Sequence, residues 1–223
     1  MDMNELLGLT EKHVEPIDPN GIQLHRKAIG PLSLLAADAE RAGFSLKVCS
    51  GFRSFAKQLR IWNEKATGIR PVLGDDGKPA DLTGLNTREI LHAILRWSAL
   101  PGASRHHWGS DFDVFDGAAM TAGYELQLTL HESRTIFAPF HEWLDRHMSA
   151  HGFFRPYPKD SGGVGAEPWH LSYAPLSLEY QKNHSEKILR ELLERSDIEL
   201  KNEILDQLPN IYSRFIANVA KPA

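Results

Sequence analysis

The chain has 223 residues, and its 42% of hydrophobic and 24% of charged residues match globular proteins, which excludes disorder over the whole length. Its 25 basic and 29 acidic residues give a net charge of −4, which leaves no broad basic field for nucleic acid. No apolar run approaches the roughly 18–20 residues of a membrane span, and a single cysteine, Cys49, excludes an internal disulfide. The eleven histidines stand out and direct the search toward a metal.

The first 20 residues lack the basic segment and apolar stretch that mark a secretory signal. The sequence as written therefore predicts a cytoplasmic protein. A periplasmic or cell-wall location is the alternative if a signal has been removed.

The first half of the chain alternates predicted helices with one strand. Helical spacing of apolar residues covers 31–43, a period-two pattern over 44–49 predicts a half-buried strand, and a second helix is expected over 54–66. Residues 67–86 are rich in glycine and proline and predict a long loop with a small hairpin at its tip. A helix over 86–97 follows, with Asn86 and Glu89 in capping-box spacing.

The second half of the chain predicts further strands and ends in helices. A short strand is expected over 111–115, a helix over 133–150, and strands with loops over 153–175. From residue 176 two helices are expected, with a break near Pro209. We therefore predict one α+β domain over 20–175 and a C-terminal helical extension over 176–223.

Three short segments carry a possible metal site. His106 and Asp113 flank a glycine turn, and His170 follows later in the chain. Two imidazoles and one carboxylate suit a zinc site that keeps a fourth position for water. Glu167 could take a proton from that water, and Arg53 could reach an oxyanion. Each of these residues alone is more often structural, so the spacing by itself leaves both interpretations open.

The combined motifs resemble those of the zinc D-alanyl-D-alanine carboxypeptidases and dipeptidases of bacterial cell-wall metabolism. The pattern is S-x-H-x-x-G with an aspartate four residues after the glycine, then E-x-W-H, and S-G-F-R-S upstream of both. In this sequence it comprises Ser50–Ser54, Ser104, His106, Gly109, Asp113, Glu167, Trp169 and His170. Pro156-Tyr157-Pro158 before the glutamate also fits. The resemblance covers about residues 20–175 in the right order.

The resemblance implies a role for each of these residues. One zinc ion would be held by His106, Asp113 and His170, with Glu167 as general base and then general acid. Arg53 would steady the carbonyl oxygen in the transition state, whereas Gln58 and Ser104 would hold the end of the substrate peptide. Trp169 could stack on the substrate or pack beneath the site. The implied fold is a small central antiparallel sheet flanked by helices, as in the related hedgehog domain.

Two positions depart from the family pattern. Asp111 stands where the family usually has a small residue, two before the aspartate ligand. Because residues two apart on a strand share a face, Asp111 could support a ligand, compete as a ligand, or be displaced by a bulge. Phe52 replaces a common tyrosine, so any hydrogen bond from that hydroxyl is absent.

The resemblance predicts a zinc peptidase that cuts beside a D-amino acid in a peptidoglycan stem peptide or muropeptide. D-Ala-D-Ala carboxypeptidase is the first expectation. L,D-carboxypeptidase and L-Ala-D-Glu endopeptidase, as in endolysins released by a holin, are alternatives. A noncatalytic zinc protein that binds a partner and a nonpeptidase hydrolase are alternatives of other classes. The C-terminal helices could pack on the domain or form a homodimer.

Overall fold

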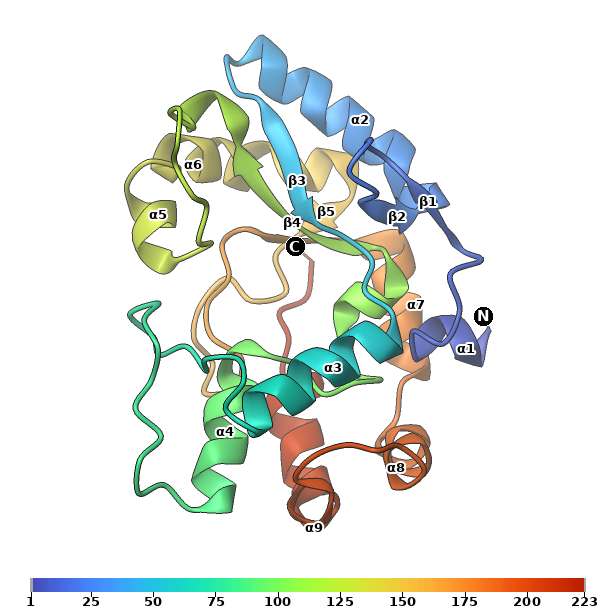
Figure 1. Cartoon of the computed structure of the whole chain (residues 1–223). Coiled ribbons are helices and arrows are strands. Elements are labelled where there is room, and N and C mark those ends of the chain that lie inside the picture. Colours follow the sequence, from blue (N-terminus) through green and yellow to red (C-terminus); the bar gives the residue numbers. More distant parts are fainter. Residues whose placement is uncertain (1, 223) are drawn as a thin grey trace.

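A four-stranded antiparallel sheet lies at the centre of the fold and carries the site motifs (Figure 1). In this computed structural model, which describes residues 2–222, the strand order is β3 (Leu46–Ser50), β4 (Asp111–Asp116), β6 (His170–Tyr173), β5 (Phe153–Phe154). The register places Asp113 opposite Ser50 on one side and opposite His170 on the other. The predicted α+β fold with a small central antiparallel sheet is confirmed.

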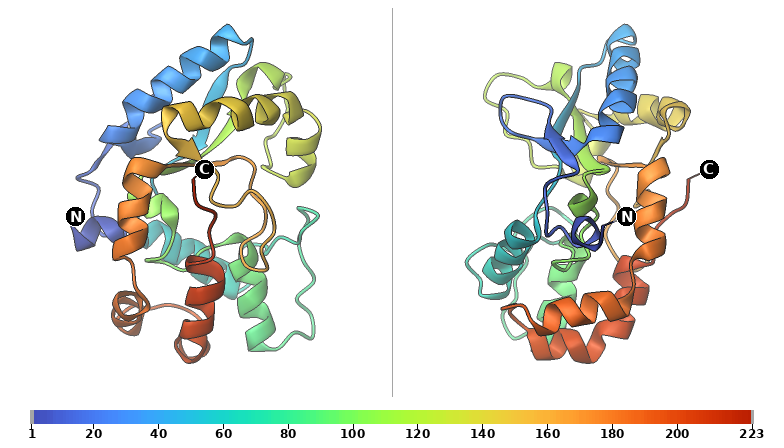
Figure 2. Two further views of the ribbon diagram at one scale, coloured as in Figure 1. Left: turned by 180° about the vertical axis from the view of Figure 1, so that it is seen from behind. Right: turned by 90° about the vertical axis from the view of Figure 1, so that its right-hand side faces the viewer.

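The two faces of the sheet serve different purposes because side chains alternate along a strand. One face carries Phe112, Val114 and Leu171, which are fully buried against α2 (Arg26–Arg41) and α6 (Ala138–His147). Figure 2, which includes a view from behind, shows both helices covering this side of the sheet. The opposite face carries the acidic and histidine side chains of the predicted site.

A second hydrophobic core joins the middle of the chain to its C-terminal extension. It lies between α3 (Phe55–Ala66), α4 (Thr87–Trp97), α8 (Glu186–Glu194) and α9 (Lys201–Ile211), which gather below the sheet in Figure 1. Its fully buried members include Trp62, Leu91, Ile94, Leu189 and Leu208. The extension therefore packs on the rest of the chain, and its role in self-association stays a prediction.

Polar caps fix where α3 and α4 begin. The Ser54 hydroxyl accepts a hydrogen bond from the Lys57 backbone at 3.3 Å, which is the N-cap arrangement. Asn86 and Glu89 form the predicted capping box, with bonds of 3.0 and 2.8 Å between each side chain and the other residue's backbone. The helices predicted over 54–66 and 86–97 are thus confirmed.

The two-helix prediction for the C-terminal extension is wrong. The segment forms α7 (Ala174–Asn183), α8, α9 and a π-helical turn over Tyr212–Ile216. Pro209 lies inside α9 instead of breaking it. Proline cannot donate to the Leu205 carbonyl four residues earlier, and the Arg190 guanidinium supplies that hydrogen bond at 3.1 Å. No helix within residues 2–222 has the length and apolarity to cross a bilayer.

The single helix predicted over 133–150 is also wrong. The segment divides into α5 (Leu130–Arg134), α6 and a 3₁₀ turn over Met148–His151. A capping box between Thr129 and Glu132 starts α5 earlier than apolar periodicity suggests. Pro139 lies in the first turn of α6, where it is favoured because its missing N–H would be unpaired there anyway.

The N-terminal segment forms elements that the sequence analysis does not anticipate. Helix α1 (Met3–Leu6) precedes an antiparallel hairpin of β1 (Val14–Pro16) and β2 (Gln23–His25). The Trp108 indole N–H donates to the Leu6 carbonyl at 3.1 Å, and the His25 backbone N–H donates to the Gly109 carbonyl at 2.8 Å. The hairpin and α1 thus brace the segment that carries His106.

We expect Leu208→Ala to destabilise the protein by about 2–5 kcal/mol, because it leaves a cavity in a core that the extension completes. Urea unfolding followed by far-UV circular dichroism measures the change. Leu34→Ala is the control, because Leu34 is 63% exposed and its loss should change stability by less than about 0.5 kcal/mol. Equal stability of both variants would contradict a shared core.

Candidate metal centre

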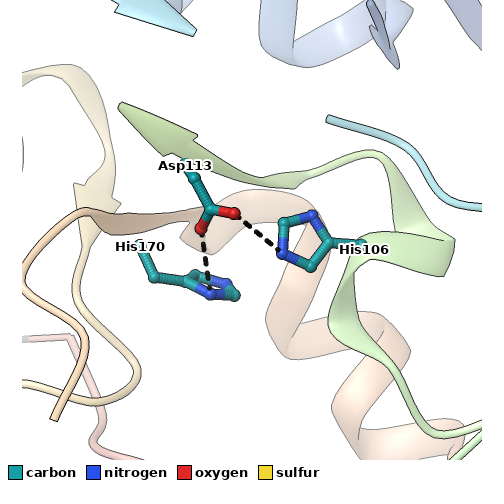
Figure 3. Close-up of side chains that lie close together, drawn as sticks. All are labelled: His106, Asp113 and His170. Carbon is teal, nitrogen blue, oxygen red and sulfur yellow. Dashed lines mark ion pairs between the residues drawn. The ribbon is translucent and has the colours of Figure 1, made fainter. Parts of the chain in front are cut away.

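Three side chains from neighbouring elements converge at one end of the sheet (Figure 3). His106 comes from the 3₁₀ helix over Arg105–Trp108, Asp113 from β4 and His170 from β6, and all three are buried. The Asp113 carboxylate lies 3.5 Å from His106 Nε2 and 3.6 Å from His170 Nδ1. One ligand atom from each residue lies within 4.8 Å of the others, so the group could hold one metal ion.

A glycine turn brings His106 back toward β4. Gly109 has a φ of 64°, in the left-handed region that favours glycine. A Cβ atom there would lie 2.7 Å from a Val14 methyl and 2.8 Å from the His25 nitrogen. The turn therefore needs glycine for its dihedral angle and for the close approach of the N-terminal hairpin.

The two imidazoles present one nitrogen each to Asp113 and use the other elsewhere. His106 Nδ1 lies 2.9 Å from the Gly51 carbonyl oxygen, which leaves Nε2 facing Asp113. His170 Nε2 lies 3.3 Å from Asp111 Oδ1, which leaves Nδ1 facing Asp113. Such partners fix the orientation of metal-binding histidines in general.

Burial and charge set the protonation of the three side chains. Burial lowers the pKa of His106 well below its usual range, and the Arg53 cation adds to this shift. Burial also opposes charge on His170, but the hydrogen bonds with Asp111 and Glu167 outweigh it and raise the pKa of His170 to about 10. Burial raises the pKa of the Asp113 carboxyl to about 6, despite the attraction of His170. At neutral pH and without metal, His170 is therefore protonated and charged, whereas His106 is neutral and Asp113 is ionised.

The donor set fits the single metal ion that the sequence predicts. Two imidazole nitrogens and a carboxylate oxygen suit zinc and other divalent transition metals. Asp113 Oδ1 is buried and has no hydrogen-bond partner among the described residues. Leaving a buried polar atom unpaired costs about 1–3 kcal/mol, so a metal at this point would satisfy it.

Glu167 and Arg53 lie beside the ligand group. Glu167 Oε2 lies 3.0 Å from His170 Nδ1, the nitrogen that faces the centre. Arg53 donates to Gln58 Oε1 at 2.9 Å and to Ser50 Oγ at 3.3 Å, and both partners are neutral. Gln58 is fully buried and bonds the Ala99 carbonyl at 2.7 Å, which places it behind Arg53 instead of at the cavity wall.

A cavity of about 210 Å³ opens in front of the ligand group. Ser104 and Trp169, the other residues proposed from the resemblance, both line it, as do Arg53 and Glu167. The Tyr157 ring also lines it, 5.4 Å from the His170 ring and nearly perpendicular to it. The sequence analysis assigns no role to Tyr157, although the Pro-Tyr-Pro segment is part of the family pattern.

Loops form the outer wall of the cavity. The long loop before α4 turns at Gly77, whose φ is 78° and where a Cβ atom would lie 2.8 Å from the Thr129 methyl. Arg96 ties this loop to the segment before Glu167, because its guanidinium bonds Asp75 at 2.9 Å and Asp160 at 2.6 Å. The loops thus enclose the cavity from the side away from the sheet.

Asp111 does not leave the strand through a bulge. It pairs in regular register with Ser172 of β6, and its side chain is fully buried. The Arg105 guanidinium lies 2.7 Å from Asp111 Oδ1 and outweighs burial, so the pKa of Asp111 falls to about 2. The sequence analysis does not anticipate Arg105, which gives no signal apart from its place beside His106.

The geometry of the site indicates a class of protein: two histidines and an aspartate that could hold a metal ion, with a glutamate beside them, are typical of metal-dependent hydrolases. Residues 21–176, more than half of the chain, match the VanY family, described as D-alanyl-D-alanine carboxypeptidase. The chain belongs to the VanY family and is a peptidoglycan peptidase of that type.

Individual relatives and a solved structure are also similar to this chain. An uncharacterised protein of Haemophilus influenzae is 31% identical over 121 residues, which are 52% of this chain and 92% of that protein. A D-alanyl-D-alanine carboxypeptidase of Enterococcus faecalis is 28% identical over 160 residues, which are 70% of this chain but only half of that enzyme. A mutant of the vancomycin-resistance D,D-pentapeptidase VanY, solved with Zn(II), has a TM-score of 0.54 and 25% identity. That match covers 80% of this chain and 90% of the other.

We expect zinc binding to release at least one proton at pH 7.5, because the raised pKa of His170 keeps it protonated until metal takes Nδ1. Zinc affinity should therefore rise about tenfold per pH unit from pH 6.5 toward 9. Below pH 6 a second proton should be released, from Asp113. Isothermal titration calorimetry in buffers of different ionisation enthalpy counts the protons, and zero release at pH 7.5 would contradict a charged His170.

Proposed function

We propose that this protein is a zinc-dependent carboxypeptidase that removes the terminal D-alanine from peptidoglycan stem peptides ending in D-Ala-D-Ala. The observation that carries the proposal is the convergence of His106, Asp113 and His170, with the Glu167 carboxylate 3.0 Å from the His170 nitrogen that faces the centre. The family match and the zinc in a similar VanY structure support it.

His106, Asp113 and His170 would hold the zinc ion. When bound, zinc acidifies water and polarises a carbonyl group, which is the chemistry that peptide hydrolysis needs. Asp113 Oδ1, which accepts no hydrogen bond within residues 2–222, and the neutral His106 are ready to coordinate, whereas His170 must first give up a proton.

Glu167 and Arg53 perform the remaining steps. Glu167 takes a proton from the water that attacks the peptide carbonyl and delivers it to the leaving amine nitrogen. Arg53 donates hydrogen bonds to the carbonyl oxygen as negative charge develops there. Its position suits this role because it is held by two neutral residues, Gln58 and Ser50, and keeps its charge available for the substrate.

The enclosure of the cavity favours a peptide end over the middle of a chain. The contact between Gly77 and Thr129 and the tie from Arg96 to two loops close the side away from the sheet. Ser104 and Trp169 on the wall would hold the terminal residue. An L,D-carboxypeptidase also takes a peptide end, whereas an L-Ala-D-Glu endopeptidase needs a groove open at both ends.

A noncatalytic binding protein is the less favoured reading. Binding alone does not need Glu167 beside the ligand group or a half-buried arginine, Arg53, that is held by neutral partners. Self-association through the C-terminal helices is a separate proposal.

Glu167→Gln should keep the fold and bound zinc but lose nearly all turnover, because the amide cannot accept the proton. His170→Ala should lose bound zinc as well as turnover. Metal content by atomic emission and hydrolysis rates measure both effects. Wild-type turnover in Glu167→Gln would remove Glu167 from its role, and unchanged zinc affinity in His170→Ala would remove His170 from the ligand set.

The substrate is tested with defined muropeptides that carry pentapeptide, tetrapeptide or tripeptide stems. We expect the zinc-loaded protein to release one D-alanine from the pentapeptide, detected by mass spectrometry, with Glu167→Gln as the inactive control. Loss of D-alanine from the tetrapeptide alone would instead establish an L,D-carboxypeptidase. Release of the whole stem would establish an endopeptidase, and no product from any stem would contradict the proposed activity.

A further inference from the structure

We propose that the buried Arg105–Asp111 ion pair is a positioning device that holds the His170 imidazole with Nε2–H on Asp111 and Nδ1 on the metal. The inference rests on the proposed metal centre and goes beyond it, because it gives a function to the aspartate that departs from the family pattern. It also explains how two acidic residues on one face of β4 coexist beside a single ion.

Asp111 is fully committed to partners other than a metal. Its Oδ1 accepts a hydrogen bond from Arg105 Nε at 2.7 Å and lies 3.3 Å from His170 Nε2. Its Oδ2 accepts a hydrogen bond from the Ser110 hydroxyl at 2.8 Å. The side chain is fully buried, and Asp111 is absent from the group whose ligand atoms converge. Asp111 therefore supports a ligand and does not compete with it.

The strand register separates the roles of the two aspartates. Asp111 lies opposite Ser172 and Asp113 opposite His170 on β6. The His170 ring spans the two carboxylates, with Nε2 toward Asp111 and Nδ1 toward Asp113 and Glu167. A metal ligand needs a lone pair on the nitrogen that faces the ion, and a carboxylate on the other nitrogen keeps the proton there.

Three other contacts hold the Arg105 guanidinium that bonds Asp111. Its Nη2 donates to Ser172 Oγ and its Nη1 to Gln181 Oε1, both at 2.8 Å. Its guanidinium carbon lies 4.6 Å from the Trp108 ring centre, a stacking contact that arginine favours. A lone buried carboxylate would be costly, so the cation that neutralises Asp111 also fixes its direction.

The His106 imidazole also has a hydrogen-bond partner on the nitrogen that faces away from the metal site. The Gly51 carbonyl oxygen lies 2.9 Å from His106 Nδ1 and leaves Nε2 for the metal. One histidine is thus oriented by the backbone and the other by a charged side chain. Removing such partners typically weakens metal affinity by about 10- to 100-fold.

The test measures zinc affinity by chelator competition and the His170 tautomer by ¹⁵N NMR, so it does not depend on activity. The variants are Asp111→Ala, Asp111→Asn and the double variant Arg105→Met with Asp111→Ala. Asp111→Ala leaves the buried Arg105 cation without its carboxylate, and this variant could fail to fold. The double variant, which removes both charges, replaces it in that case. Asp116→Asn is the matched control, because Asp116 is a buried β4 carboxylate whose side chain, among residues 2–222, accepts hydrogen bonds from the Ser45 and Ala118 backbone alone.

We expect the alanine variant and the double variant to bind zinc about 10- to 100-fold more weakly than the wild type. Asp111→Asn keeps an acceptor for the His170 Nε2–H, so its zinc affinity should lie closer to that of the wild type. The zinc affinity of Asp116→Asn should equal that of the wild type. In the zinc-loaded wild type, NMR should show His170 protonated on Nε2.

Unchanged zinc affinity in both alanine-containing variants, or zinc on His170 Nε2 in the wild type, would overturn the inference while leaving the proposed function intact. A wild type that binds no zinc would overturn both, and failure on every muropeptide with normal zinc binding would count against the activity alone.

Discussion

The buried carboxylate of Asp113, set between two imidazoles, is the constraint on which the rest of the site depends. An uncompensated charge in a protein interior costs several kcal/mol, so the chain must provide partners from every side. The register of β4 and β6 brings His170 opposite, the Gly109 turn brings His106 back, and Arg53 adds a cation at the cavity wall. Among residues 2–222, Asp113 Oδ1 still accepts no hydrogen bond, and this leaves it available to a metal ion.

Side chains alternate along strand β4, so its packing residues and its site residues lie on opposite faces of the sheet. Phe112 and Val114 face α2 and α6, and this packing holds the strand while Asp111 and Asp113 face the opposite side. The outer wall of the cavity in front of those carboxylates is formed by loops that connect to the second core. The candidate ligands lie between the two hydrophobic cores, on elements that these cores hold rigid. The cavity wall opposite them is formed by loops.

The sequence predicts the sheet, the helices with clear caps and the convergence of the three candidate ligands, because these depend on local patterns or on a motif with fixed spacing. It does not predict that Pro209 lies within α9, since a distant arginine supplies the missing hydrogen bond. Nor does it predict the break between α5 and α6, where a capping box competes with a continuous apolar stripe. Gln58 illustrates the same limit: the resemblance implies that it holds the substrate, and only the fold shows that it is buried behind Arg53. Such features are decided by contacts between segments far apart in the chain.

The contacts of the Trp108 indole limit how far this protein can be shortened without loss of support for the site. Its N–H bonds the Leu6 carbonyl, and its ring stacks on Tyr180 with centres 5.4 Å apart. Both partners lie outside residues 21–176, the span of the family match. A fragment trimmed to that span would strip both supports from the residue that follows the His106–His107 pair, and would also open the core completed by α8 and α9. Expression boundaries for this protein are therefore better drawn from the packing around the candidate metal ligands than from the limits of the family match.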